Sequence, residues 1–150
     1  MRDVVQRVSK AQVSVDEEIV GSIGTGLVVL LAVGSRDGSE DLGFMVRKLV
    51  NLRVFNDAGG KLNRSVVDAG GEILLISQFT LYGDCRKGNR PSFTRAAPPD
   101  KADATYKQLA EELRSRGVRV ATGRFQAMMS VSLVNEGPVT LIIDSKKEFH

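Results

Sequence analysis

The 150-residue sequence contains one cysteine, one histidine and no tryptophan. A single cysteine, Cys85, cannot form a disulfide within the chain, so we expect a reducing setting, the cytoplasm. The one histidine is His150, the last residue of the sequence. A Ser-His-Asp or Cys-His arrangement needs an ordered imidazole next to the nucleophile. The sequence therefore argues against a Ser-His-Asp or Cys-His catalytic site.

Three further patterns are missing. No pair of cysteine or histidine residues has the spacing of metal ligands, so we expect no metal ion and no other cofactor. The longest apolar run, Leu27–Val33, is far short of the roughly 18 residues that a membrane helix requires, and we expect no membrane association. The glycine-rich stretch Gly21–Gly26 lacks the spacing and the lysine of a nucleotide-binding loop.

The composition is that of an ordinary globular protein, with 42% hydrophobic and 26% charged residues. This length suits one domain spanning residues 1–150, since two domains would each have a marginal core. Residues 145–150 form a polar tail that we expect to be loosely ordered. The 21 Lys and Arg exceed the 18 Asp and Glu, and a net charge of +3 is compatible with an RNA partner without requiring one.

Two segments have the periodicity of amphipathic helices. Apolar residues recur at helical spacing from Glu40 to Asn51, with Ser39 as the expected N-cap. A second helix should start at Pro98-Pro99-Asp100 and run to about Arg116, and Gly117 should close it.

The remaining apolar segments are short, and several alternate with polar residues, as strands do. Leu27–Val33 is apolar throughout and should be covered on both faces. Other strands are expected at 4–15, 19–23, 52–55, 73–76, 129–134 and 139–143. Because strands and helices do not alternate regularly, the pattern predicts an α+β fold. We expect antiparallel strands in a sandwich or barrel-like sheet, with the two helices packed outside.

Two polar segments are candidates for a functional site. Ser77-Gln78-Phe79-Thr80 directly follows the apolar strand 73–76, where polar groups must either be satisfied by the fold or contact a ligand. Asn135–Thr140 contains Gly137-Pro138 between two strands, which is also the pattern of a plain turn. An enzyme with so few acid–base groups would depend on backbone N–H donors for an oxyanion, and one such donor contributes about 3 kcal/mol.

These two segments resemble the signatures of the D-aminoacyl-tRNA deacylase family. The family motifs stand here as Ser77-Gln78-Phe79-Thr80-Leu81 and Gly137-Pro138-Val139-Thr140. Three further stretches, in the same order as in the family, are Val5-Gln6-Arg7-Val8, Arg90-Pro91-Ser92-Phe93 and Thr122-Gly123-Arg124-Phe125. The resemblance extends from residue 2 to about residue 144.

The resemblance implies a homodimeric hydrolase that cleaves the ester of D-aminoacyl-tRNA and, as a side reaction, glycyl-tRNA. It further implies a cis Gly137-Pro138 bond that enters the active site of the other subunit and excludes L-amino acids by a steric clash. Arg7 would orient this segment. Ser77, Gln78, Phe79 and Thr80 would line the scissile ester, and Phe125 and Met129 would hold the terminal adenine.

Several alternatives remain open at this stage. Thr80 has a hydroxyl in a plausible place for a nucleophile, but activation of water by the 2′-hydroxyl of the substrate fits the missing base better. Phe125 and Met129 are equally compatible with ordinary core packing. The rival functions are a non-catalytic RNA-binding module, a hydrolase of the same fold for another mischarged tRNA, and a structural oligomer. A DNA partner is not expected.

Overall fold

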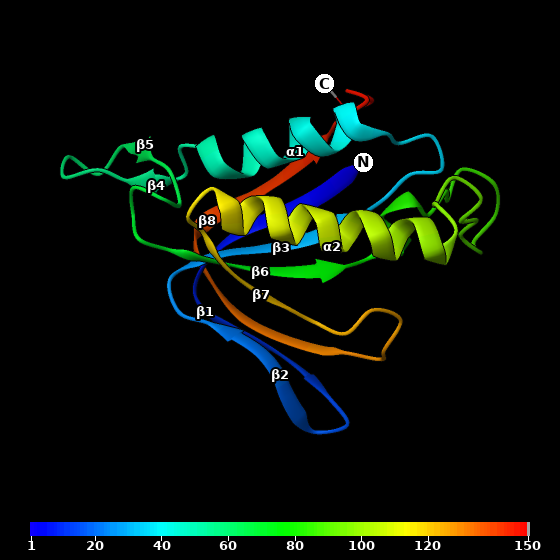
Figure 1. The fold of residues 1–150 in the computed structure, drawn as a ribbon, viewed down its shortest axis with the longest axis horizontal. Helices are drawn as coiled ribbons and strands as arrows, with labels where there is room; N and C mark the ends of the chain where they lie inside the picture. Colours follow the sequence, from blue (N-terminus) through cyan, green and yellow to red (C-terminus); the bar gives the residue numbers. More distant parts are fainter. Residues whose placement is uncertain (150) are drawn as a thin grey trace.

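A computed structural model describes residues 1–149, which fold around one six-stranded sheet that curls into a nearly closed barrel (Figure 1). The strands are β1 (Arg2–Val15), β2 (Glu18–Ile23), β3 (Gly26–Ala32), β6 (Glu72–Ser77), β7 (Arg119–Thr122) and β8 (Ser130–Asp144). A separate small hairpin consists of β4 (Phe55–Asn56) and β5 (Leu62–Arg64). The helices are α1 (Ser39–Asn51), the 3₁₀ turn η1 (Phe79–Tyr82) and α2 (Pro99–Ser115).

The sheet is mixed. Its order is β2-β1-β3-β6-β7, and β8 pairs with β1. The prediction of antiparallel pairing is correct for β1 with β2, β3 and β8 but wrong for β6 and β7, which continue the sheet in parallel. The cause is the position of the helices in the chain. Because α1 lies between β3 and β6, and α2 between β6 and β7, each helix returns the chain to the same end of the sheet.

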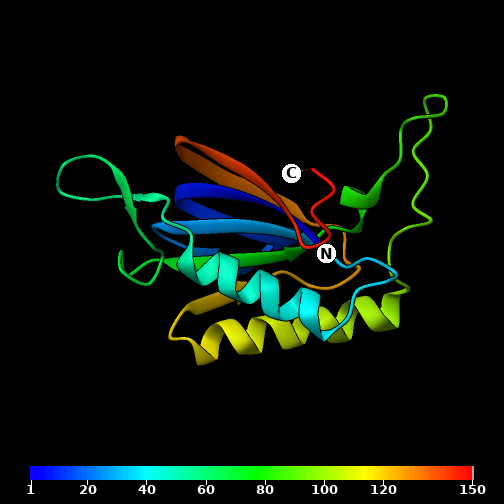
Figure 2. The same ribbon diagram turned by 90° about the horizontal axis from the view of Figure 1, so that it is seen from above.

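Both helices cover the same face of the sheet, as Figure 2 shows. The larger core lies between this face and the helices, and it includes Leu27 and Leu75 from the sheet, Leu49 from α1 and Leu109 from α2, all fully buried. A second core, around Val13, Val28, Leu74 and Ile76, fills the curl of the sheet. The strand predicted to be covered on both faces, now β3, contributes to both cores. Within residues 1–149, no helix is long and apolar enough to cross a membrane.

The predicted helices form with one shift at a cap. Ser39 is the first residue of α1, and its N-cap is Gly38, whose N–H donates to Asp41 Oδ2 at 2.9 Å. The expectation of a Ser39 cap is therefore wrong by one position, because the carboxylate of Asp41 bonds the start of the helix in place of a serine cap. At the end of α2, Gly117 has φ +87°, which confirms its predicted role.

The polar tail is tied to the start of the chain as far as it is described, contrary to our expectation of loose ordering. Ser145 donates its N–H to Met1 O at 2.9 Å, and its Oγ accepts from the Met1 ammonium at 2.8 Å. Glu148 forms ion pairs with Arg2 and Arg95. Several of these contacts join positions more than 140 residues apart, which no local pattern indicates. His150 lies outside the described residues.

One buried acid lies within the sheet without a partner. Asp3 on β1 is fully buried, and neither carboxylate oxygen has a hydrogen-bond partner within residues 1–149. Burial raises the pKa of Asp3 well above its usual value, and the nearby N-terminal ammonium only partly opposes this rise. A raised pKa in the folded state means that folding favours the protonated acid, so the ionised form destabilises the fold as pH increases.

We expect Asp3→Asn to raise the free energy of unfolding at pH 7.5 by about 1–3 kcal/mol, because the amide cannot ionise and so avoids the cost of holding this buried acid protonated above its usual pKa. The advantage should shrink as the pH falls toward the usual pKa of an aspartate, where Asp3 becomes protonated in both states. Urea denaturation at several pH values measures this, with the exposed Glu18→Gln as the control that removes one negative charge. An Asp3→Asn variant less stable than the parent at pH 7.5 would contradict the assignment.

Candidate active site

A cavity of about 540 Å³ lies at the end of β6, where the polar segment begins. It contains five of the residues predicted for the site: Ser77, Gln78, Phe79, Phe125 and Met129. The structure thus brings together two segments that are far apart in the sequence. The rest of the wall is apolar or uncharged: Val33, Ile76, Phe93, Ala96, Ala97, Pro99, Ala102, Gln126, Ala127 and Val131.

The strand end is fixed by the ladder of the sheet. Ser77 is paired with Leu31 on β3, and the N–H of Gln78 donates to Leu31 O at 2.7 Å. The chain then turns into η1, so that Phe79 projects with about half of its surface exposed. Its ring meets that of Phe93 edge to face, with 5.2 Å between centroids. Of the Arg90–Phe93 stretch, the structure places Phe93 at the wall of the cavity.

The polar groups of the turn provide donors and no base. The Gln78 side-chain amide donates to the hydroxyl of Thr80, and an amide cannot accept the proton that a nucleophilic threonine must lose. The first two N–H groups of a 3₁₀ turn, here those of Phe79 and Thr80, have no acceptor inside it. Residues 1–149 supply no backbone acceptor for them either.

No titratable side chain lines the cavity among the described residues. The nearby Tyr106 packs against Phe125, with ring centroids 6.3 Å apart. Its hydroxyl donates to Leu75 O at 2.7 Å, and burial raises the pKa of Tyr106 to about 12. Tyr106 therefore stays protonated at neutral pH and cannot serve as a general base. Within residues 1–149, no three His, Cys, Asp or Glu side chains gather as a metal site.

Phe125 and Met129 line the cavity and also pack against the two cores. The packing and ligand interpretations of these residues therefore do not exclude each other. Met129 approaches the backbone closely, since a Cβ at Gly123 would lie 2.5 Å from Met129 Sδ. A side chain at position 123 would therefore require the end of the Met129 side chain to shift.

The Gly137-Pro138 bond is cis, as the resemblance implied, but it lies outside the cavity. It lies within β8 rather than between two strands, which corrects the expected boundary at 134–139. Gln6 pairs with Thr140 and Val8 with Asn135, so two residue steps on β1 face five on β8. Three additional residues of β8 are thereby displaced from the ladder as a bulge.

Hydrogen bonds hold this bulge from both sides. Buried Arg7 donates from Nε to Glu136 O at 2.9 Å and from Nη1 to Val54 O at 2.8 Å. Asn135 Nδ2 donates to Arg7 O at 2.9 Å and to Val139 O at 3.2 Å. The structure thus brings Arg7 to the Gly-Pro segment. It also shows that Asn135 helps to hold the bulge, a role that the sequence did not indicate.

Comparison with known proteins identifies the family. The sequence pattern of the family described as D-Tyr-tRNA(Tyr) deacylase matches residues 4–144. A D-aminoacyl-tRNA deacylase from Syntrophotalea carbinolica is 60% identical over 149 residues, covering 99% of this chain and all of that protein. The chain belongs to the D-aminoacyl-tRNA deacylase family. It is a hydrolase of that family, in which relatives from Desulfitobacterium hafniense are 59% identical.

Solved structures support the same fold. The structure titled "c-Myc DNA Unwinding Element Binding Protein" superposes on this deacylase with a TM-score of 0.90 at 43% identity, covering 96% of this chain and 98% of the other. A structure titled as a probable eukaryotic D-amino acid tRNA deacylase superposes with a TM-score of 0.83 and shares the fold at 21% identity, covering 95% of this chain and 97% of the other.

We expect Thr80→Ala to keep kcat of this deacylase within about threefold of the parent, because no base is placed to make Thr80 a nucleophile. Single-turnover hydrolysis of D-aminoacyl-tRNA measures the chemical step directly. A loss of roughly 10⁴- to 10⁶-fold, the range that removal of a true nucleophile causes, with substrate binding intact, would identify Thr80 as the attacking group.

Proposed function

We propose that this deacylase hydrolyses the ester between a D-amino acid and the 3′ end of tRNA in the cytoplasm, releasing the free D-amino acid and tRNA. The observation that carries the proposal is the cavity at the end of β6, which has aromatic walls and no titratable side chain among the described residues. It adjoins a turn whose first N–H groups, those of Phe79 and Thr80, have no backbone acceptor within residues 1–149, although Thr80 itself does not line the cavity. An aminoacyl ester is activated enough to be cleaved with such limited means, and family membership supplies the substrate class.

The scissile ester lies against Ser77, Gln78, Phe79 and Thr80 in this proposal. The N–H groups of Phe79 and Thr80 stabilise the oxyanion that forms when water attacks the carbonyl carbon, and each such donor contributes about 3 kcal/mol. The carbon–oxygen bond to the ribose then breaks, and the 3′-hydroxyl departs with a proton. The 2′-hydroxyl of the same ribose helps to activate the water, which is consistent with a cavity wall whose described residues offer no base.

The terminal adenine occupies the part of the cavity near Phe125 and Met129. Phe125 is partly exposed and lines the cavity, and an aromatic face is the usual platform for an unpaired base. Met129 provides a polarisable apolar surface next to it. The packing of both side chains against the core fixes their orientation before the nucleotide arrives.

The Gly137-Pro138 segment acts on the partner subunit of a homodimer. Val131 on β8 lines the cavity, but Gly137 is six residues further along the strand, roughly 20 Å away at about 3.3 Å per residue. The segment therefore does not reach the cavity of its own subunit. Within residues 1–149, β8 pairs only with β1, and its exposed Val134, Leu141 and Ile142 offer apolar surface for association.

Chirality is selected by exclusion in this arrangement. With the ester and amino group fixed, an L-amino acid directs its side chain at the Gly137-Pro138 carbonyl groups, whereas a D-amino acid presents only hydrogen. Glycine has no side chain to exclude, so glycyl-tRNA is also cleaved. Arg7 keeps the bulge in place through its bond to Glu136 O.

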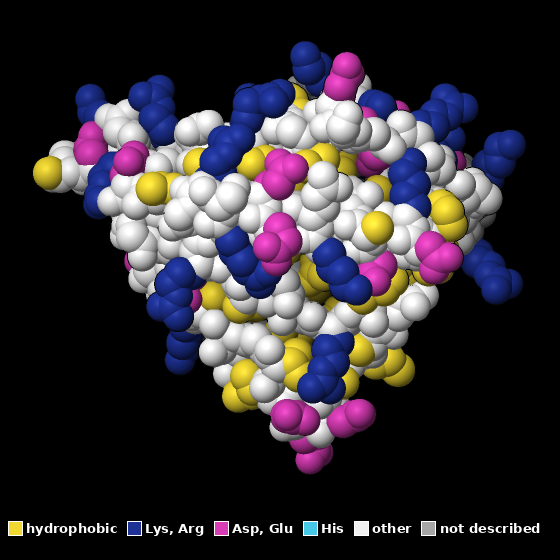
Figure 3. All heavy atoms as spheres, viewed as in Figure 1, with side chains coloured by type: hydrophobic (Ala, Val, Ile, Leu, Met, Phe, Trp, Pro, Cys, Tyr) yellow, Lys and Arg dark blue, Asp and Glu magenta, His cyan; other side chains and the backbone are white. Residues whose placement is uncertain are grey.

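The main alternative is a nucleic-acid-binding protein without catalysis, because one structural relative is titled for binding a DNA element. The face seen in Figure 3 gives this little support. On the face seen in Figure 3, Lys and Arg side chains are scattered among acidic ones rather than gathered into one patch. A hydrolase of the same fold for another mischarged tRNA is the second alternative, and turnover distinguishes all three.

We expect purified protein to release D-tyrosine from D-tyrosyl-tRNA and to leave matched L-tyrosyl-tRNA intact, with or without a chelator. Release of labelled amino acid over time measures both rates. Binding of both RNAs without release would favour the non-catalytic alternative. Equal cleavage of both would show that chirality is not selected, and inhibition by the chelator would indicate a metal requirement.

We expect Pro138→Ala to lower the ratio of D- to L-cleavage by at least about tenfold, because the segment that excludes L side chains would be reshaped. Pro138 is exposed in one subunit, so the variant should remain folded. Sedimentation controls for the dimer, and Pro98→Ala, an exposed proline at the N-cap of α2 that does not line the cavity, serves as a matched proline substitution. An unchanged ratio in a folded dimer would rule out this selection mechanism.

A further inference from the structure

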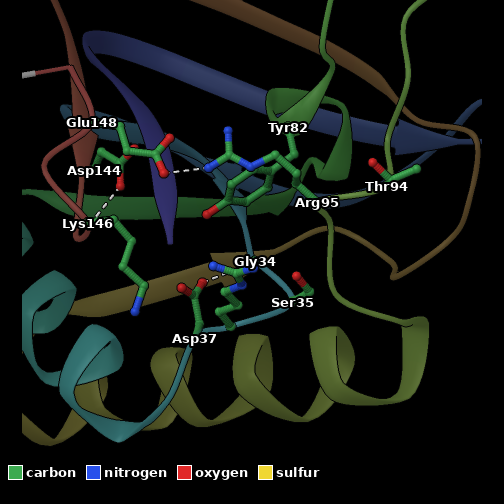
Figure 4. Close-up of a pocket in the computed structure, with 10 residues that line it drawn as sticks. Gly34, Ser35, Asp37, Tyr82, Thr94, Arg95, Asp144, Lys146 and Glu148 are labelled. Carbon is green, nitrogen blue, oxygen red and sulfur yellow. Dashed lines mark hydrogen bonds and ion pairs between the residues drawn. The ribbon is translucent and has the colours of Figure 1, made fainter.

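A pair of arginines lies next to the candidate active site, on the other side of the same two segments. Phe79, Phe93 and Ala96 face the cavity, whereas Tyr82 and Arg95 face a separate hollow of about 550 Å³. The guanidinium groups of Arg2 and Arg95 both lie over the Tyr82 ring, at 4.5 and 5.9 Å from its centroid. Figure 4 shows Arg95 beside Tyr82, with Glu148 reaching it from the tail.

The first arginine is rigidly held. Arg2 Nε donates to Asp144 Oδ2 at 3.1 Å, and Nη1 donates to Leu81 O at 3.3 Å. Its guanidinium also lies over the rings of Tyr82 and Phe149, the latter at 4.7 Å, and only 10% of the side chain is exposed. With Nε and Nη1 already bonded and the side chain buried, Nη2 is the remaining nitrogen and has a defined position.

That nitrogen donates to a carboxylate from the chain itself. Glu148 accepts from Arg2 Nη2 on one oxygen and from Arg95 Nη2 on the other. These bonds lower the pKa of Glu148, so it is ionised at neutral pH. An anion held by two guanidinium forks is the arrangement that also suits a phosphate group. Glu148 and Arg95 are 37% and 47% exposed, so an incoming anion can reach both.

Two hollows that share Glu148 bring further arginines close to this carboxylate. A second hollow of about 420 Å³ shares Tyr82, Arg95 and Glu148 with the first and adds Arg2. The first hollow also contains Arg36, which has no acidic partner within residues 1–149. The acids of this wall are already matched, Asp37 by the Met1 ammonium at 2.7 Å and Asp144 by Arg2.

We propose that Arg2 and Arg95 form a phosphodiester site for the acceptor arm of tRNA, and that Glu148 occupies this site in the free protein. The inference rests on the proposed function, since the site lies behind the turn that lines the cavity for the 3′ end. Binding of RNA exchanges the Glu148 carboxylate for a backbone phosphate. The two hollows that share Glu148 together offer an extended RNA strand more room than a small anion would need.

The test measures how tightly the full-length protein binds an acceptor-stem RNA that has a CCA end and carries no amino acid. Fluorescence anisotropy gives the affinity over a range of salt concentrations. Glu148→Gln removes the competing charge and should tighten binding about three- to tenfold. Glu18→Gln, at the tip of the β1–β2 hairpin, makes the same change in net charge and should leave affinity nearly unchanged (Figure 1).

Arg95→Gln added to Glu148→Gln should cancel the gain and reduce the slope of log affinity against log salt by about one, the effect of losing one phosphate contact. Equal affinities of the Glu148→Gln and Glu18→Gln proteins would overturn the proposal. The proposal would also be overturned if inorganic phosphate occupied the arginine site, at matched ionic strength, without weakening the binding of RNA. The measurement uses RNA that carries no amino acid and reports binding alone. A failure to hydrolyse the ester would therefore contradict the proposed function but would leave the result of this binding test unaffected.

Discussion

The structure depends on one long strand that is paired along both edges. β1 pairs with β3 through Arg2–Val8 and with β2 through Ala11–Val15, while β8 follows its other edge from Arg2 to Ser14. A slip of one residue in either ladder would move every side chain of β1 to the opposite face. The register therefore determines where Arg7 enters the protein, and the two-against-five mismatch beside it displaces the Gly137-Pro138 segment from the ladder.

The elements that could be predicted well from the sequence are those specified locally. Both helices follow from apolar spacing over a few turns, and the strand ending at Ser77 follows from an abrupt change in polarity. The parallel pairing of β6 and β7 could not be predicted, because it depends on helices that join distant segments. Strand β7, Arg119–Thr122, was missed since its burial comes from neighbours rather than from its own alternation. In the site, the cis Gly137-Pro138 bond was predicted from the family resemblance alone. The anchoring of the tail was predicted neither from the residue pattern nor from the resemblance.

The cavity has no titratable side chain among its described lining residues, and this restricts how it can discriminate among substrates. Apolar walls and backbone donors recognise an ester and a base, and in the proposed function they make no contact that depends on the configuration of the α-carbon. In the proposed function, selection must then come from an element outside the cavity wall. The bulge on β8 suits that task because Arg7 and Asn135 fix it to the sheet. A rigid element excludes a side chain more sharply than a flexible loop, which would move aside.

The turn η1 connects the cavity and the arginine pair physically. Its first residue, Phe79, lines the cavity, and its last ones, Leu81 and Tyr82, contact Arg2. A phosphate bound by Arg2 would therefore be linked, through Arg2, to the same short turn that contains the proposed oxyanion donors. Because Arg2 also bonds Asp144 at the end of β8, the turn is fixed to the strand that carries the Gly-Pro bulge. Binding energy gained on the RNA backbone can thus be used to position the ester, which is how contacts remote from a reacting bond increase its rate.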